Sequence, residues 1–278
     1  MDVIGQNVLL FVTKYTFLYS RGSIMRHLFR FLIASCILFM VQNASAVLYT
    51  SNYGTLLPNS SNCDDCFDGP IAFPGSGQSI SFFGSSYPNL YVGSNGYVTF
   101  GSGQTGYTSS PLNVQTLAPM IAGLFTDLWS NGSALSNVYA NTDTPGQIVV
   151  TWERMDLFPT TGSGPATFQL VIRSSQFVVP PGEGQIGFYY GPITLPATTA
   201  SAGFGDGLAA VNPGEVAFFS GNPNTMSNAA TQWYSLSSTG VPITSATAPI
   251  PTLSEWSMII LSALLALGTF VVMRRKQV

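Results

Sequence analysis

The sequence predicts an all-β protein: an antiparallel β-sandwich ectodomain with an N-terminal signal helix and one C-terminal transmembrane helix. Two observations lead to this prediction. Across the middle of the chain, short runs rich in Val, Ile, Phe and Tyr alternate with clusters of Gly, Pro, Asn and Ser, and helical periodicity is almost absent. Each end of the 278-residue chain carries an apolar segment with basic residues beside it. About 200 residues remain between these ends, which is enough for one sizeable domain.

The N-terminal segment has the order of a secretory signal: a basic region, an apolar run and a small-residue cleavage site. Counted from Met25, these parts are Arg26 and Arg30, residues 31–41, and Ala44-Ser45-Ala46. We therefore expect cleavage after Ala46, which removes residues 1–46 and leaves Val47 at the new N-terminus. Residues 1–24 either lengthen the basic region or precede the true start. We favour the second interpretation, because the signal is complete from Met25.

The exported part is strongly acidic and lacks histidine. Residues 47–249 contain two arginines, no lysine and ten Asp or Glu residues, a formal balance of −8. Such a surface repels phosphate backbones, so we expect no nucleic-acid partner. It is compatible with divalent cations or neutral glycans, although solubility alone also explains it. Without histidine, Ser-His-Asp and Cys-His catalysis and His-based zinc sites cannot form. We therefore predict no catalytic residue, no cofactor and no enzymatic activity.

Eight segments of the ectodomain, residues 47–234, have the composition and length of strands. In chain order they are Ser79–Phe83, Leu90–Val92, Tyr97–Phe100, Ile148–Trp152, Thr167–Ile172, Gln185–Tyr190, Ala202–Gly205 and Val216–Ser220. The clearest hairpin turns at Asn95-Gly96, because this pair accepts the positive φ of a type I′ turn. Gly96 should therefore be harder to replace than Gly103 in the loop beyond. Residues 235–249, rich in Ser, Thr and Pro, are predicted to form an extended stalk.

The sequence Cys63-Asp64-Asp65-Cys66 allows two kinds of site. In an exported chain a disulfide between the two cysteines is the expected state, and a second CxxC pair that would complete a zinc cage is missing. Asp64, Asp65 and Asp68 could ligate Ca²⁺ through their oxygens, although their spacing is not that of an EF-hand. The favoured alternative is a solvated acidic turn before the first strand. No metal site is therefore assigned.

Two further carboxylates and three aromatic residues are candidate site residues. Asp127 lies between apolar neighbours and is expected to be a buried, hydrogen-bonding turn residue. Together with Glu153 it could in principle hydrolyse a glycoside, which needs two acids across a sugar, but nothing in the spacing favours this. The core is the expected place of Trp129, Trp152 and Tyr190. Stacking of their rings against a sugar is the less favoured interpretation.

Several of these segments resemble the nidogen-like, or NIDO-type, extracellular domain. The similar motifs are Phe82-Phe83-Gly84, residues 90–100, Leu117-Ala118-Pro119, residues 125–129, residues 149–152, residues 167–172 and residues 202–207. They occur in the order of that family, from about Asp64 to Phe219. The resemblance implies a β-rich extracellular module of adhesive or matrix proteins, to which no enzymatic activity is attributed.

The last 29 residues, 250–278, form three successive parts. They are the motif Ile250, Pro251, Thr252, Leu253, Ser254, Glu255 and Trp256; an apolar segment predicted to be a transmembrane helix over 257–273; and the basic residues Arg274, Arg275 and Lys276. The 16 apolar residues 258–273 would form a helix about 24 Å long, short of the ~30 Å hydrocarbon core. Trp256 and Ser257 should therefore reach the interface, with the basic residues on the cytoplasmic side.

This order resembles the IPTL-type C-terminal sorting signal of Gram-negative bacteria, although Ser257 stands where that family usually has Gly. The resemblance implies an exosortase-type processing enzyme as a partner. It also implies anchoring in the inner membrane through the C-terminal helix, followed by transfer to the cell surface or the extracellular space. The sequence-based hypothesis is a non-enzymatic, adhesive surface or matrix protein with a glycan or protein ligand. The alternatives are a structural envelope protein without a ligand, and a secreted glycan-binding or glycan-active protein.

Overall fold

The computed structural model describes residues 48–109, 112, 118–130, 135–162, 165–208, 210 and 212–244. The predicted cleavage site, sorting motif, helix 257–273 and basic end lie outside these residues. In the described part the regular structure is antiparallel strands and one short 3₁₀-helix, η2 (Pro223–Met226). None of the helices in this part is long and apolar enough to cross a membrane.

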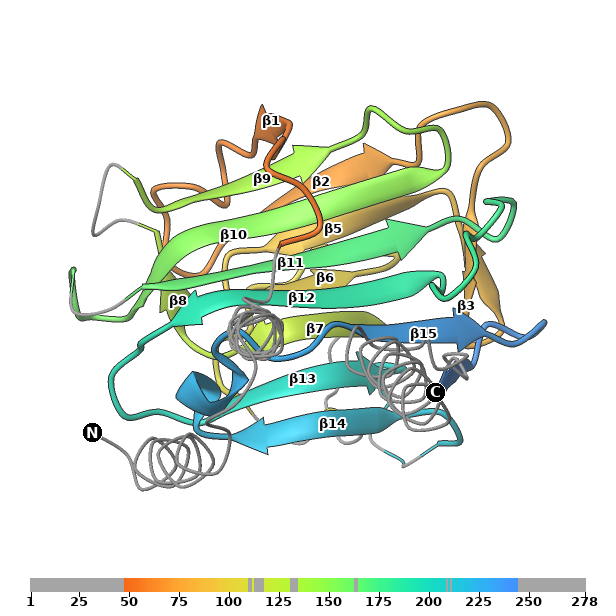
Figure 1. Ribbon diagram of the computed structural model, residues 1–278. Coiled ribbons are helices and arrows are strands. Elements are labelled where there is room, and N and C mark those ends of the chain that lie inside the picture. Colours follow the sequence, from red (N-terminus) through yellow and green to blue (C-terminus); the bar gives the residue numbers. More distant parts are fainter. Residues whose placement is uncertain are drawn as a thin grey trace, which may run out of the picture. The chain divides into compact units, whose positions relative to one another are not determined.

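The larger sheet contains eight strands. They are β1 (Thr55–Leu56), β8 (Leu128–Trp129), β9 (Asn137–Asn141), β10 (Gln147–Leu157), β11 (Ala166–Arg173), β12 (Ile186–Ile193), β15 (Gln232–Leu236) and β16 (Pro242–Thr244). Their order across the sheet is β1-β9-β10-β11-β12-β15-β16, and β8 pairs separately with β10. The long neighbouring strands β10, β11 and β12 form the centre of this layer (Figure 1).

The second sheet contains six strands. They are β2 (Phe67–Ala72), β5 (Asn89–Gly93), β6 (Tyr97–Thr99), β7 (Met120–Phe125), β13 (Ala200–Gly205) and β14 (Val216–Gly221). Their order is β14-β13-β7-β6-β5-β2, so β14 and β2 are its two edges. A small ribbon of β3 (Ile80–Phe82) and β4 (Ser85–Tyr87) completes the fold.

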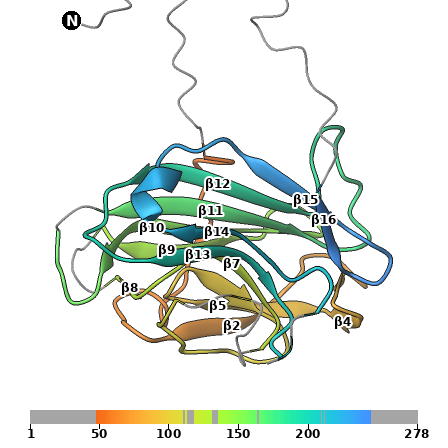
Figure 2. The same ribbon diagram turned by 90° about the horizontal axis from the view of Figure 1, so that it is seen from below.

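Figure 2 shows the strands arranged in layers, and the buried hydrophobic core lies between the two sheets. Trp152 of β10 is fully buried, stacks on Phe168 of β11 at 5.0 Å between ring centroids, and donates from Nε1 to the carbonyl of Gly93 in β5 (2.9 Å). The hydroxyl of Tyr190 in β12 likewise donates to the carbonyl of Gly123 in β7 (2.8 Å). Large aromatic side chains thus fill the interior and also hydrogen-bond one sheet to the other. The predicted antiparallel β-sandwich is confirmed.

All eight predicted strand segments lie in or overlap observed strands, namely β3, β5, β6 and β10 to β14. The predicted stalk is wrong for its first part. Residues 235–236 end β15, and residues 242–244 form β16, where Ser235 is opposite Ile243. The polar residues there fit because β16 is an edge strand with one side toward solvent. The folded domain therefore extends to Thr244, beyond the expected boundary at residue 234.

The hairpin at Asn95-Gly96 exists, but its turn is not type I′. Gly93 pairs with Tyr97, which leaves a three-residue loop of Ser94, Asn95 and Gly96. Gly96 has φ +82°, whereas Asn95 is not among the residues with positive φ. This arrangement fits the three-residue hairpin that ends in a left-handed residue.

One buried ion pair lies on the outer side of the larger sheet. Arg173 of β11 is 1% exposed and pairs with Glu183. Its guanidinium also donates to Gln147 Oε1 (2.8 Å) and to the hydroxyl of Tyr49 (3.3 Å). The ring of Trp233 in β15 lies 4.6 Å from the guanidinium carbon. This cluster fixes the segment that precedes β1 against the sheet.

Candidate functional site

Three aspartates from separate parts of the chain converge into what we call the acidic cluster. Asp64 and Asp65 lie in the loop before β2, and Asp127 lies in the short connection between β7 and β8. One carboxylate oxygen from each residue lies within 4.8 Å of the others. All three residues are partly buried. Among the described residues, this is the cluster whose chemistry could support a ligand site.

The loop that carries the first two aspartates is held by short local contacts. Cys63 and Cys66 form a disulfide, which confirms the predicted pairing. The Ser94 hydroxyl donates to the carbonyl of Asp64 and accepts from the backbone N–H of Cys66 (3.0 Å). The Ser94 N–H donates in turn to the Cys66 carbonyl (2.9 Å). The loop is thus attached to the turn between β5 and β6.

Asn95 joins this loop to the strand that follows the third aspartate. Its side chain is fully buried. Nδ2 donates to Asp65 Oδ1 (2.9 Å), and Oδ1 accepts from the backbone N–H of Leu128 (2.7 Å), directly after Asp127. A buried amide that uses both of its ends in this way holds its two partners at a fixed separation. The sequence drew attention to Asn95 for its turn propensity, but carried no sign of this second role.

A bulge in β10 explains why β8 lies at this end of the sandwich. The pairing of β10 with β11 shifts between Trp152 and Met155, and Arg154 there has φ +51°. Before the bulge β10 pairs with β9, and after it Asp156 lies opposite Trp129 of β8. A bulge bends its strand and redirects its pairing. The residues at the start of β8 are thereby placed near the disulfide loop.

The electrostatics of the acidic cluster favour a proton or a cation. Burial, and then the charges of Asp64 and Asp65, raise the pKa of Asp127 to about 6. Burial, followed by the charge of Asp65, also raises the pKa of Asp64. Oδ1 of Asp64 is buried and has no hydrogen-bond partner among the described residues. In that same part of the chain the ion pair found is Arg173–Glu183, so no basic side chain neutralises the three carboxylates.

The chemistry available here is the binding of a hard cation or the sharing of protons. Calcium takes six to eight oxygen ligands at about 2.3–2.6 Å, so ligands on opposite sides of the ion lie about 5 Å apart. Carboxylate oxygens within 4.8 Å of one another are compatible with this spacing. Asp64, Asp65 and Asp127 could supply three of the ligands. Like-charged carboxylates this close otherwise retain protons to a higher pH.

The third aspartate proposed from the sequence is corrected by the structure. Asp68 is buried, and its carboxylate accepts from Asn59 Nδ2 (2.9 Å) and from the backbone N–H of Ser60 (2.5 Å). It therefore fixes the turn before the disulfide loop and does not belong to the acidic cluster. Asp127 takes the third place instead. Its side chain has no hydrogen bond among the described residues; only its carbonyl accepts one, from the N–H of Phe158 (2.9 Å).

The structure does not bring Asp127 and Glu153 together. The charge of Glu153 acts on the hydroxyls of Tyr53 and Tyr139, whereas Asp127 is influenced by the two aspartates of the disulfide loop. Trp152 and Tyr190 are core residues, as expected. Trp129 is half-buried and stacks on Phe158 at 4.9 Å, so that one of its faces is already covered.

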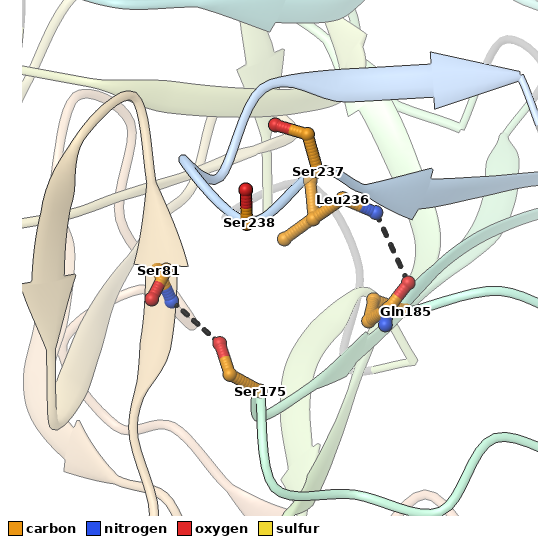
Figure 3. Close-up of a pocket in the computed structure, with 6 residues that line it drawn as sticks. All are labelled: Ser81, Ser175, Gln185, Leu236, Ser237 and Ser238. Carbon is orange, nitrogen blue, oxygen red and sulfur yellow. Dashed lines mark hydrogen bonds between the residues drawn. The ribbon is translucent and has the colours of Figure 1, made fainter.

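A separate feature of the described part of the protein is a small pocket lined mainly by hydroxyl groups (Figure 3). The lining residues are Ser81, Ser175, Gln185, Leu236, Ser237 and Ser238. Its volume is about 210 Å³, below the roughly 300–1,000 Å³ of ligand pockets. Two hydrogen bonds fix its walls: the N–H of Ser81 donates to Ser175 Oγ (2.9 Å), and the N–H of Leu236 to Gln185 Oε1 (3.0 Å). We assign no ligand to it.

An antiparallel sandwich with a disulfide-closed loop, preceded by a signal-like segment, is typical of the β modules of exported proteins. Comparison with protein families identifies the module. A family model described as NIDO related matches residues 40–247, and a model described as the IPTL-CTERM motif matches residues 248–275. The chain belongs to the NIDO-related family and carries an IPTL-CTERM motif directly after that domain.

These matches confirm both resemblances that the sequence motifs indicated. The IPTL-CTERM motif implies processing by an exosortase-type enzyme. No curated protein and no solved structure was found to match the chain. The two family matches together indicate an exported surface protein.

Proposed function

We propose that this protein is a non-enzymatic adhesive component of the cell surface or extracellular matrix of a Gram-negative bacterium. It is exported by its N-terminal signal, held in the inner membrane by helix 257–273, and then processed by an exosortase-type enzyme. The observation that carries this proposal is the order of the two family matches. A NIDO-related domain over residues 40–247 is followed at once by a sorting motif over 248–275.

The short connection between domain and motif supports processing next to the membrane. The last described residue of β16 is Thr244, and the motif begins at Ile250. The five residues between them span at most about 18 Å even when fully extended. A folded module on so short a connection is held near the enzyme that recognises the motif.

The adhesive part of the proposal is supported by what the sandwich offers to solvent. Its charge is almost entirely acidic, which keeps the molecule soluble and leaves neutral glycans or proteins as compatible ligands. The carboxylates best placed for acid–base chemistry are those of the acidic cluster, and the described residues contain no histidine that could assist them, since the sole histidine of the sequence is His27. Asp127 and Glu153 have different charged neighbours, which gives no support to the paired-acid arrangement of a glycosidase.

Sorting can be tested with two proline variants in a host that carries an exosortase. Pro251 fixes its own φ and keeps Ile250 extended, which suits presentation of the motif to an enzyme. We expect Pro251→Ala to block maturation while the full-length chain stays in the membrane fraction on a fractionated immunoblot. Pro249→Ala is the matched control and should mature normally, because Pro249 precedes the segment Ile250 to Trp256, although it lies within the matched residues 248–275. If Pro251→Ala matures as wild type does, the tail is a plain anchor and the sorting proposal fails.

The adhesive role requires a binding measurement on the mature protein. We expect the purified protein to bind members of a glycan array or immobilised matrix from the producing strain, without turnover of the bound sugar. Surface location without binding would favour the structural envelope alternative. Sugar turnover that is lost in Asp127→Asn or Glu153→Gln would show that the protein is a glycan-active enzyme.

A further inference from the structure

The two sheets of the sandwich have four outer edges, and three of them are protected against pairing with another chain. β1 has only two residues, and Leu57 and Ser61 hydrogen-bond to Val138 of β9 beyond it. β16 has three residues and begins with proline. β2 contains proline at position 70 and a register shift. Short length, proline and bulges are the usual means by which β proteins prevent edge-to-edge association.

The fourth edge, β14, is neither short nor interrupted by proline, although its pairing with β13 also shifts register at Phe218. Its six residues are Val216, Ala217, Phe218, Phe219, Ser220 and Gly221, without proline, lysine or any charge. One side of the strand pairs with β13. On its other side, no backbone hydrogen bond to another described residue is found. Alternate residues of such an edge direct their N–H and C=O groups outward. Figure 1 shows β14 as the last strand of its sheet, below β13.

Contacts of one β14 side chain with aromatic residues of the core hold the strand in position. The ring of Phe218 packs on Phe188 of β12 at 4.8 Å and on Tyr234 of β15 at 5.7 Å between centroids. The strand is therefore attached to the core through one face. Val216 is 42% exposed, and Ala217 is also exposed, so apolar side chains border the open edge. A pre-ordered edge costs little conformational entropy when a partner strand pairs with it.

The charge distribution permits a second copy as the partner. Residues 216–249 contain no charged residue, although residues 47–249 as a whole carry a balance of −8. The nearest acid in sequence is Glu215, whose carboxylate accepts from the backbone N–H groups of Asp206 (3.0 Å) and Asn212. In antiparallel pairing of two β14 strands, the two Glu215 residues lie at opposite ends of the ladder, about 20 Å apart. This exceeds the Debye length of about 8 Å at physiological salt, so their repulsion is screened.

We propose that β14 is an assembly edge that pairs antiparallel with β14 of a second copy and joins the two smaller sheets into one. The contact is isologous, since the same residues serve on both sides, and it closes as a dimer. Parallel pairing would place the two Glu215 carboxylates side by side and is disfavoured. This inference does not depend on the ligand or on the processing of the protein.

Cysteine cross-linking of the full-length chain in its producing cells tests the contact. Ser220→Cys places a thiol on β14, whereas Ser85→Cys places one on β4, exposed in the β3–β4 ribbon. The native Cys63–Cys66 pair is bonded and does not compete. With a bis-maleimide reagent we expect a covalent dimer of twice the chain mass for Ser220→Cys and not for Ser85→Cys. Equal yields for the two variants, or a product with a chain of different mass, would overturn the proposal.

A charge placed on the edge provides a second readout. Val216→Lys, combined with Ser220→Cys, should reduce the cross-linked fraction about tenfold or more, since an edge lysine opposes strand pairing. Val216→Thr keeps the β-branched shape without a charge and should retain most of the cross-link. Melting temperatures of the variants show that each is folded. Undiminished cross-linking in the folded Val216→Lys variant would contradict pairing through β14.

Discussion

Replacement of Gly96 by alanine perturbs the turn on which both the hairpin and the acidic cluster depend. Gly96 has φ +82°, and a Cβ added there would overlap the carbonyl oxygen of Leu124 in β7 and lie 2.9 Å from its carbonyl carbon. The carbonyl of Gly96 accepts hydrogen bonds from the N–H groups of Gly123 (2.9 Å) and Leu124 (3.0 Å). The turn cannot move away from Leu124 without weakening these bonds.

The loss of folding stability expected for Gly96→Ala is the sum of two separate costs. The left-handed conformation costs a residue with a Cβ about 1–2 kcal/mol. Displacement of the turn weakens two backbone hydrogen bonds, each with a net contribution of about 1 kcal/mol. The sum is about 3–4 kcal/mol. In a domain of this size, 1 kcal/mol lowers the melting temperature by about 2–4 °C, so Gly96→Ala should lower it by roughly 6–16 °C.

Gly84 provides the matched control for this experiment. It has φ +80°, but no atom lies within 4 Å of an added Cβ, so Gly84→Ala carries the conformational cost alone. Gly103, which the sequence suggested as a tolerant position, is unsuitable because an added Cβ would overlap the ring of Phe67. We expect thermal melts of the mature protein to show a shift for Gly96→Ala at least twice that for Gly84→Ala. Equal shifts would refute the argument that the contact with Leu124 decides the effect.

Three further predictions concern charge and cross-links. The pKa of Asp127 is raised to about 6 in the folded protein from its ordinary value of 3.8. The folded state therefore binds more protons between these values, and stability falls as pH rises from about 3.8 to 6. Asp127→Asn should flatten this part of a pH series of thermal melts; an unchanged slope would contradict the shift. Replacing Cys63 and Cys66 by serine should lower the free energy of unfolding by about 2 kcal/mol or less, because the loop that the disulfide closes is short. A larger loss in urea unfolding would show that the disulfide has another role. Arg173→Met should lower the free energy of unfolding by about 3–5 kcal/mol in the same assay, because it leaves the partly buried Glu183 unpaired. Adding Glu183→Gln to this variant should recover part of the loss.

The strands that the sequence predicted correctly are those with an apolar, β-branched or aromatic pattern between clear turn residues, such as β11 and β12. The missed strands lack this contrast. β7 has Ala122 and Gly123 at its centre, where strands are usually rich in β-branched or aromatic residues. β2 contains Gly69-Pro70, which reads as a turn. β16 lies in a Ser/Thr/Pro-rich stretch, and only its pairing with β15 makes it a strand.

Only part of the acidic cluster could be predicted from the sequence, because one of its members is brought in by tertiary structure. Asp64 and Asp65 are neighbours in sequence, so their proximity could be expected before the structure was known. Asp127 reaches them only through the bulge in β10 and the hydrogen bonds of Asn95, which are tertiary features. Asp68 is close in sequence, but the N–H of Ser60 and the amide of Asn59 already occupy its carboxylate. Sequence distance is therefore a poor guide to which carboxylates share a site in a sandwich.

The corrected C-terminal boundary also changes what processing can release. Because Tyr234 pairs with Thr244 and Leu236 with Pro242, a cut before Thr244 would remove part of β16 and expose the edge of β15. A cut at or near the motif, after Ile250, leaves all the described strands in place. The mature protein then keeps both sheets, the acidic cluster and the β14 edge. Folding and processing are therefore compatible only if the enzyme cuts on the C-terminal side of Thr244, within the short connection or the motif itself.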